Sequence, residues 1–336
     1  MTSANTAAKV QDSPVRNTLQ NRFKQLKDEL STRIIGQSEL LEKILIALLA
    51  DGHLLVEGAP GLAKTTAIKE LGDRIEGDFS RIQFTPDLLP ADLTGTDIYR
   101  PASGTFEFQP GPLFHNLILA DEINRAPAKV QSALLEAMGE RQITVGRKTY
   151  RLPELFMVMA TQNPIEQEGT YPLPEAQMDR FLLHVNISYP QAATERAILR
   201  LVRNEEISKN KPVGVFELSQ EDIFAARKEI SQLHIADALE EYLVQLVLAT
   251  RNPSLYGDDL NNTIQYGASP RGTIALERTA RAHAWLQGKN FVGPEDIQAM
   301  AVDTLRHRVG LSYAAESAGM TREKFIEILL HRVPLS

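Results

Sequence analysis

A loop of small residues followed by a lysine and two threonines is the segment best suited to chemistry. It comprises Gly58, Ala59, Pro60, Gly61, Leu62, Ala63, Lys64, Thr65 and Thr66. An apolar run precedes it and a helical pattern follows, so backbone N–H groups at a helix N-terminus can surround phosphate oxygens. Lys64 can reach the β- and γ-phosphates, and the Thr65 hydroxyl can ligate Mg²⁺. The loop therefore predicts a phosphate site, although Ala63 replaces the last glycine of the usual pattern and leaves the affinity open.

Two carboxylates and an amide follow apolar runs further along the chain. Asp121 and Glu122 come directly after residues 116–120, and Asn163 follows residues 157–160. Buried parallel strands read as continuous apolar runs, and ligands bind at their carboxyl ends. We therefore expect Asp121 in the Mg²⁺ shell, Glu122 beside an attacking water and Asn163 orienting that water. The alternatives are a solvated turn for the acidic pair and a turn-forming Asn before Pro.

Two arginines are candidates for contacts with phosphate. Arg180 lies in residues 174–181, which read as a short helix, and from a neighbouring subunit it would stabilise the charge of a phosphoryl-transfer transition state. A single Arg at such a place is more often part of a surface ion pair. Arg271 lies in the first turn of a helix that Ser269 would cap and Pro270 would begin. It would reach phosphate only if two domains close over the nucleotide.

Composition limits the class of protein. The chain has 336 residues, of which 43% are hydrophobic, enough for two modest domains with their own cores. Its net charge of −7 differs from the basic balance usual for nucleic-acid-binding proteins. It contains no cysteine, which excludes disulfides and thiolate metal sites and fits a cytoplasmic location. No apolar stretch is long enough to predict a membrane span.

The pattern of elements predicts a nucleotide-binding α/β domain followed by a helical one. Residues 1–19 are expected to form a flexible tail, residues 20–188 an α/β core, and residues 189–336 a smaller domain without strands. Five strands alternate with helices and predict a parallel sheet, over residues 53–57, 79–84, 116–120, 155–161 and 182–187. Alternating residues predict two further hairpins, at 97–108 and 142–152, for which ordinary surface decoration is the alternative.

With these motifs in place, the chain from about Arg22 onward resembles the AAA+ ATPases of the MoxR family. The most specific segment is 119–138, which resembles the Walker B strand of that family and its following helix. The phosphate loop with Ala63 is similar to its Walker A motif. The resemblance implies an AAA+ P-loop domain with a five-stranded parallel sheet, followed by an all-α lid domain.

The resemblance also implies roles for individual residues. Lys64 and Thr65 are similar to the Walker A pair, Asp121 and Glu122 to the Walker B pair, and Asn163 to sensor 1. Arg180 resembles an arginine finger, and Arg271 resembles sensor 2, acting in its own protomer or in the next. Ile35 and Gly36 lie in a segment similar to the one that contacts adenine. The two hairpins resemble the helix-2 insert and the pre-sensor-1 hairpin, which face the central pore of a ring in relatives.

The function implied is that of an ATP-dependent, Mg²⁺-requiring motor that assembles as a hexameric ring. Such motors remodel client protein complexes or help to insert metals or cofactors, and a partner with a von Willebrand A domain is typical. Three alternatives remain: a nucleotide-gated binding module without useful turnover, a metal-chelatase-like motor subunit, and a nucleic-acid motor. The acidic balance disfavours the last of these.

Overall fold

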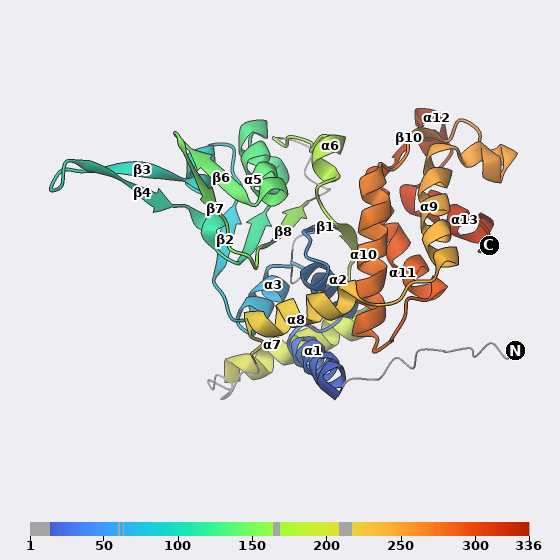
Figure 1. Ribbon diagram of the computed structural model, residues 1–336, viewed down its shortest axis with the longest axis horizontal. Coiled ribbons are helices and arrows are strands. Elements are labelled where there is room, and N and C mark those ends of the chain that lie inside the picture. The colour runs from blue at the N-terminus through green and yellow to red at the C-terminus, as the bar shows by residue number, and fades with distance from the viewer. Residues whose placement is uncertain (1–13, 60, 63, 164–168, 208–216, 336) are drawn as a thin grey trace, which may run out of the picture.

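The fold is built around a parallel sheet of five strands in the order β2-β5-β8-β1-β9 (Figure 1). The computed structural model describes residues 14–59, 61–62, 64–163, 169–207 and 217–335. The strands of the sheet are β1 (Leu54–Gly58), β2 (Phe79–Gln83), β5 (Leu117–Asp121), β8 (Met157–Gln162) and β9 (Leu183–Ile187). All pairings between them are parallel, which confirms the predicted sheet.

Helices cover both faces of the sheet because successive strand residues point to opposite sides. Leu54 and Val56 pack into one apolar cluster with the helices that flank the loop, whereas Leu55 packs into a second cluster with α5. The helices of this part are α1 (Pro14–Arg33), α2 (Ser38–Leu49), α3 (Lys64–Gly72), α4 (Pro90–Thr94), α5 (Ala128–Glu140) and α6 (Glu175–Met178).

The first helix begins earlier than the sequence analysis expected. It starts at Pro14, inside the segment 1–19 that was predicted to be a flexible tail. Leu19 is buried in the main apolar cluster, and this burial favours continuing the helix toward the N-terminus. Residues 1–13 lie outside the described part of the chain.

The part that follows β9 is mainly helical, as predicted. Its helices are α7 (Ala192–Ile207), α8 (Gln220–Ser231), α9 (Asp237–Arg251), α10 (Pro270–Leu286), α11 (Pro294–Leu305), α12 (Tyr313–Ser317) and α13 (Arg322–Arg332). The prediction that it has no strands was wrong, because β10 (Ile264–Tyr266) and β11 (Gly310–Leu311) pair antiparallel. Strands of two or three residues are too short for an alternating pattern to reveal.

One apolar cluster runs from α1 through the sheet to α13. Within it, Phe23 of α1 meets Trp285 of α10 edge to face, with ring centroids 5.3 Å apart. The helices after residue 188 thus share a core with helices that precede the sheet. The domain boundaries given above stay predictions. Short 3-10 turns connect the elements at Pro112–Phe114, Ile123–Arg125, Pro253–Tyr256, Asp258–Leu260 and Arg306–Arg308.

Both predicted hairpins are present beside the sheet. The strands β3 (Gly95–Arg100) and β4 (Thr105–Pro110) form a long hairpin that projects from the body (Figure 1). The shorter hairpin consists of β6 (Gln142–Val145) and β7 (Lys148–Arg151). The ring of Phe108 stacks on that of Tyr150 at 4.0 Å between centroids, so the two hairpins support each other.

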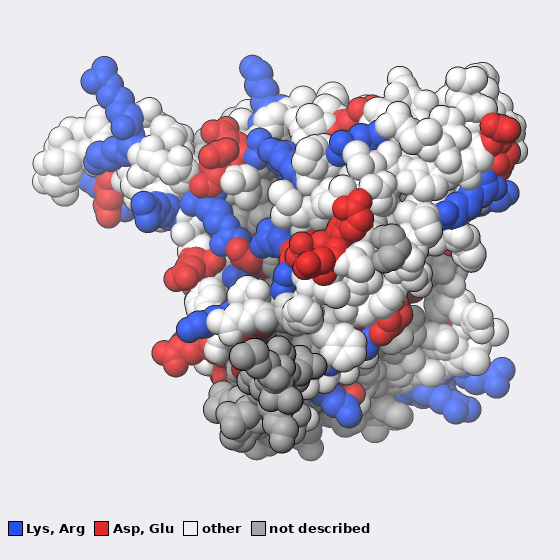
Figure 2. All heavy atoms as spheres, turned by 45° about the vertical axis from the view of Figure 1, so that its right-hand side comes forward, with Lys and Arg blue, Asp and Glu red and all other residues white. Residues whose placement is uncertain are grey.

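The surface carries charges of both signs. On the face drawn in Figure 2, Lys and Arg side chains lie interspersed with Asp and Glu side chains over the described residues. None of the helices in the described ranges combines the length and the apolar character that crossing a bilayer requires.

Candidate functional site

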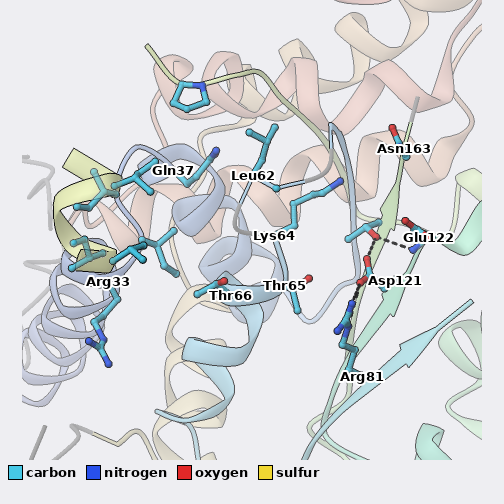
Figure 3. A pocket seen from close by; sticks show the side chains of 18 of the residues that line it. Arg33, Gln37, Leu62, Lys64, Thr65, Thr66, Arg81, Asp121, Glu122 and Asn163 are labelled. Atoms are coloured by element: carbon cyan, nitrogen blue, oxygen red, sulfur yellow. Dashed lines mark hydrogen bonds and ion pairs between the residues drawn. The ribbon is translucent and has the colours of Figure 1, made fainter. Parts of the chain in front are cut away.

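A cavity of about 590 Å³ lies at the carboxyl ends of the central strands (Figure 3). Three segments distant in sequence meet there: the turn between α1 and α2, the loop before α3, and the ends of β5 and β8. A fourth wall comes from α7, which contributes the apolar side chains Ile198, Leu201 and Val202. This combination of polar and apolar lining groups suits a ligand that combines phosphates with a flat apolar ring.

The predicted phosphate loop lies between the end of β1 and the start of α3. Its residues that line the cavity are Gly61, Leu62, Lys64, Thr65 and Thr66, whereas Gly58 and Ala59 are buried behind it. Pro60 and Ala63 lie outside the described residues. Gly61 has a φ of +83°, a conformation that an L side chain rarely adopts. The loop therefore presents the N-terminus of α3 to the cavity, as a phosphate site requires.

Lys64 is the first residue of α3, directly after this loop. Its Nζ donates to the carbonyl oxygen of Gly58 at 2.7 Å. Burial lowers the pKa of the ammonium group, while the carboxylates of Asp121 and Glu122 act in the opposite direction. Lys64 thus faces both predicted Walker B carboxylates across the same cavity.

Asp121 ends β5 and has partners on both carboxylate oxygens. Oδ1 accepts from the Thr161 hydroxyl at 2.6 Å, and Oδ2 accepts from Arg81 Nη2 at 2.6 Å. Neither Arg81 nor Thr161 was predicted from the sequence to belong to the site. In the sequence pattern, Thr161 is simply one residue of an apolar strand. Arg81 has the pattern of a solvent-exposed residue on an edge strand.

Glu122 follows in a conformation that is unusual for a residue with a side chain. Its φ is +57°, in the left-handed region. The Thr161 hydroxyl accepts its backbone N–H at 2.9 Å, while its carboxylate accepts from Gln83 Nε2 at 2.9 Å and pairs with Arg125 at 3.3 Å. These contacts hold the carboxylate at the edge of the cavity beside Asp121 (Figure 3).

Of the remaining residues predicted for this site, some line the cavity and one does not. Asn163 follows β8, is 7% exposed and lines the cavity. Ile35 lines it from the turn between α1 and α2. Gly36 belongs to the same turn with a φ of +81° but is not among the lining residues. A β-carbon there would lie 2.1 Å from Thr194 of α7, so the close approach of these segments depends on glycine.

The structure does not bring Arg180 or Arg271 to this cavity. Both line a second cavity of about 360 Å³, between α5, the segment before β9 and the start of α10. Arg180 Nη1 donates to the carbonyl oxygen of Leu135 at 2.9 Å. The side chain of Arg271 is 64% exposed, and its Nη1 lies 3.9 Å from Oδ2 of Asp179. We refer to this second site as the arginine cavity.

A buried arginine, Arg308, holds in place the segment before β9 that forms one wall of the arginine cavity. Arg308 donates from Nε to Oδ1 of Asp179 at 2.8 Å and from Nη2 to the carbonyl oxygen of Phe181 at 2.7 Å. Burial lowers the pKa of Arg308 to about 10. Ser269 caps α10, as predicted, and its hydroxyl donates to Oδ2 of Asp179 at 3.0 Å. Asp179 therefore joins the segment that carries Arg180 to the helix that carries Arg271.

The oxygen donors of the first cavity suit a hard divalent cation. The Thr65 hydroxyl and the Asp121 carboxylate line the same space. Within the described ranges, no group of three or more His, Cys, Asp or Glu residues forms a metal cage. Mg²⁺ in nucleotide sites needs only one or two protein ligands, because phosphate and water oxygens supply the others. The donor set therefore fits Mg²⁺ bound together with a nucleotide.

Comparisons with known proteins agree with this geometry. Residues 53–183 match the family model described as ATPase family associated with various cellular activities (AAA), and residues 259–328 match the AAA lid domain. The Chaperone MoxR1 of Mycobacterium tuberculosis is 44% identical over 91% of this chain and 80% of its own length. The Protein MoxR of Paracoccus denitrificans is 34% identical over 88% and 90%, respectively.

A solved structure shows the same fold. The crystal structure of a candidate ATPase from Cytophaga hutchinsonii superposes with a TM-score of 0.88 at 46% sequence identity. The match covers 95% of this chain and 96% of that one. Together with the extent of the curated matches, this likeness confirms the predicted AAA+ fold. The chain belongs to the MoxR family of AAA+ ATPases.

Proposed function

We propose that this chain hydrolyses ATP with Mg²⁺ and uses the energy, as a ring of like chains, to remodel or mature client protein complexes. The observation that carries the proposal is the first cavity, where the phosphate loop, two carboxylates and Asn163 converge. Membership of an ATPase family supports the same reaction. The nearby apolar residues of α7 and Ile35 would contact the base.

The proposed roles follow from position. The N-terminus of α3 and Lys64 would hold the phosphates, and Thr65 and Asp121 would hold Mg²⁺, which neutralises charge on the phosphoryl group. Glu122 would polarise the attacking water, and Asn163 would align it. The Gln83 and Arg125 contacts support the placement of the Glu122 carboxylate.

Arg180 and Arg271 would act on the nucleotide of the neighbouring protomer. Both line the arginine cavity, and neither lines the first cavity, which we refer to as the nucleotide cavity; this supports action in trans for the pair. An arginine finger contributes about 10³–10⁵ in rate, so turnover should require assembly. The ring is proposed to be hexameric and cytoplasmic, where ATP is available.

The client is proposed to be a protein complex that the two hairpins and a von Willebrand A domain partner help to engage. The name of one relative, Chaperone MoxR1, supports a chaperone role. Affinity purification of the tagged chain in the presence of ATP tests whether such a client complex and partner bind to it. Recovery of metal-chelatase subunits as the main partner would instead favour the chelatase-like function.

The central experiment measures the ATPase rate against protein concentration, with mass photometry on the same samples in the presence of ATP and Mg²⁺. We expect the rate per chain to rise as rings of about six chains appear. A constant rate per chain, while the assembly state changes, would rule out catalysis in trans. Assembled rings without turnover would support a nucleotide-gated module instead.

A further inference from the structure

Arg81 of β2, an edge strand of the sheet, contacts the carboxylate of Asp121. Two of its nitrogens donate to Oδ2 of Asp121, Nη2 at 2.6 Å and Nε at 3.2 Å (Figure 3). In the register between β2 and β5, Gln83 lies opposite Asp121, so the Arg81 side chain extends forward along the sheet to reach the carboxylate. Both donors of the guanidinium thus fall on Oδ2, and Arg81 and Asp121 line the same cavity.

The contacts on the two carboxylate oxygens differ in how easily they can be exchanged. Thr161, on Oδ1, is 1% exposed and also accepts the backbone N–H of Glu122, so that its place is fixed. The side chain of Arg81 is 50% exposed, whereas that of Asp121 is 13% exposed. Exposed ion pairs contribute little to stability, and a half-exposed arginine can leave without opening the core. Arg81 is thus the exchangeable partner.

From this geometry we propose that Arg81 competes with the metal ion for Oδ2 of Asp121. The inference rests on the proposed function, in which Asp121 ligates Mg²⁺. A guanidinium and a divalent cation cannot share this oxygen at close range, because their like charges repel. Metal binding therefore requires Arg81 to release Asp121, and Arg81 sets the Mg²⁺ concentration at which the site loads.

The release of Arg81 would also affect the position of the Glu122 carboxylate, because Gln83 contacts both residues. Arg81 Nη2 lies 3.3 Å from Gln83 Oε1, and Gln83 Nε2 donates to Glu122 Oε2 at 2.9 Å. Because the same Nη2 contacts both Asp121 and Gln83, displacement of this nitrogen would also remove a partner that fixes the Gln83 side chain. The competitor for the metal is thus linked to the group that would polarise water, and Arg81 acts as a positioning residue.

The test measures the affinity of the full chain for a fluorescent, non-hydrolysable ATP analogue over a Mg²⁺ series that starts in EDTA. The readout is the Mg²⁺ concentration that gives half of the metal-dependent gain in affinity. We expect Arg81→Gln to lower this concentration about twofold to fivefold, as loss of an exposed competing ion pair implies. The affinity in EDTA should stay unchanged. If Arg81→Gln lowers the thermal stability, Arg81→Lys, which keeps the charge but not the two-nitrogen contact, should give a smaller shift in the same direction.

Two further variants separate the possible outcomes. Arg100→Gln removes a matched ion pair with Glu107 on the projecting hairpin, where the side chains are 54% and 63% exposed, and should leave the Mg²⁺ response unaltered. Asp121→Asn should abolish the response. A wild-type response in Asp121→Asn would overturn the metal site of the proposed function. Loss of the response there, together with no shift in Arg81→Gln or weaker binding of the analogue in EDTA, would overturn only the role of Arg81.

Discussion

The nucleotide cavity and the arginine cavity hold opposite kinds of groups. The first contains the carboxylates of Asp121 and Glu122 together with the phosphate loop. The second is lined by Arg141, Arg180, Arg271, Arg278 and Arg308, with two aspartates. Phosphoryl transfer needs both a metal-binding carboxylate and mobile positive charge. Their separation within one chain is what a site completed by a neighbouring chain would require.

The largest expected effect comes from removing Arg180 and then supplying it from a neighbouring chain, which tests whether the two cavities act together between chains. Arg180→Ala should lower turnover by about 10³-fold or more, if the residue is an arginine finger. Glu122→Gln should also be nearly inactive alone. Mixed rings of the two variants should regain part of the activity, because some junctions combine an intact Arg180 with an intact Glu122. Steady-state ATPase assays of mixtures at fixed total protein would show this, and inactive mixed rings would contradict action in trans.

The next largest effect concerns Glu122 in the nucleotide cavity. Glu122→Gln should lower turnover by about 10²–10⁴-fold, the usual contribution of a general base. Nucleotide affinity should remain near that of the wild type, because the phosphate loop and Lys64 are untouched. Equilibrium binding of a fluorescent ATP analogue, with Lys64→Ala as the variant that loses binding, measures the difference. Appreciable turnover by Glu122→Gln would exclude this residue as the base.

The smallest effect concerns a buried histidine of the arginine cavity and the pH dependence of stability. His53 lines this cavity, and burial, followed by the charge of Arg141, lowers its pKa from 6.5 to about 4. The unfolded chain therefore takes up the proton first as the pH falls. The stabilisation from neutral His53 is complete above pH 6.5 and is lost between pH 6.5 and 4, a change of about 3 kcal/mol.

His53→Asn should flatten this dependence while keeping an acceptor for the backbone N–H of Val158. Denaturant unfolding at several pH values between 4 and 7 would measure the slope. Part of the slope should persist in the variant, because burial also lowers the pKa of His307. An identical slope in wild type and His53→Asn would show that the His53 proton does not contribute.

The sequence was sufficient to predict the sheet, and it also indicated the phosphate-loop and strand-end residues that line the nucleotide cavity. Continuous apolar runs that end in Asp121, Glu122 and Asn163 are local patterns, and the carboxyl ends of parallel strands bring such residues together without further information. The capping of α10 by Ser269 is equally local and was confirmed.

Contacts that depend on strand register could not be predicted. The Arg81 contact needs β2 to pair with β5 in one particular register, and an Arg on an edge strand looks like any solvated residue. The left-handed backbone of Glu122 is held by Thr161, a partner on another strand. Likewise, nothing in the sequence indicated that Arg180 and Arg271 share one cavity, since Asp179 and Arg308 join their segments through side chains.

The order of strands in the sheet has a consequence for the folding of the newly made chain. Strand β1, which leads into the phosphate loop, pairs with β8 and β9 in the sheet. Leu54 therefore has no strand partner until Met159 and Leu183 have been synthesised. Pairing over such a long sequence separation is slow, because a large loop must close first. A ribosome-bound chain that stops before β8 would therefore hold the loop sequence without the strand partners that support it. Nucleotide binding should be acquired late in synthesis and abruptly, when β8 enters between β5 and β1.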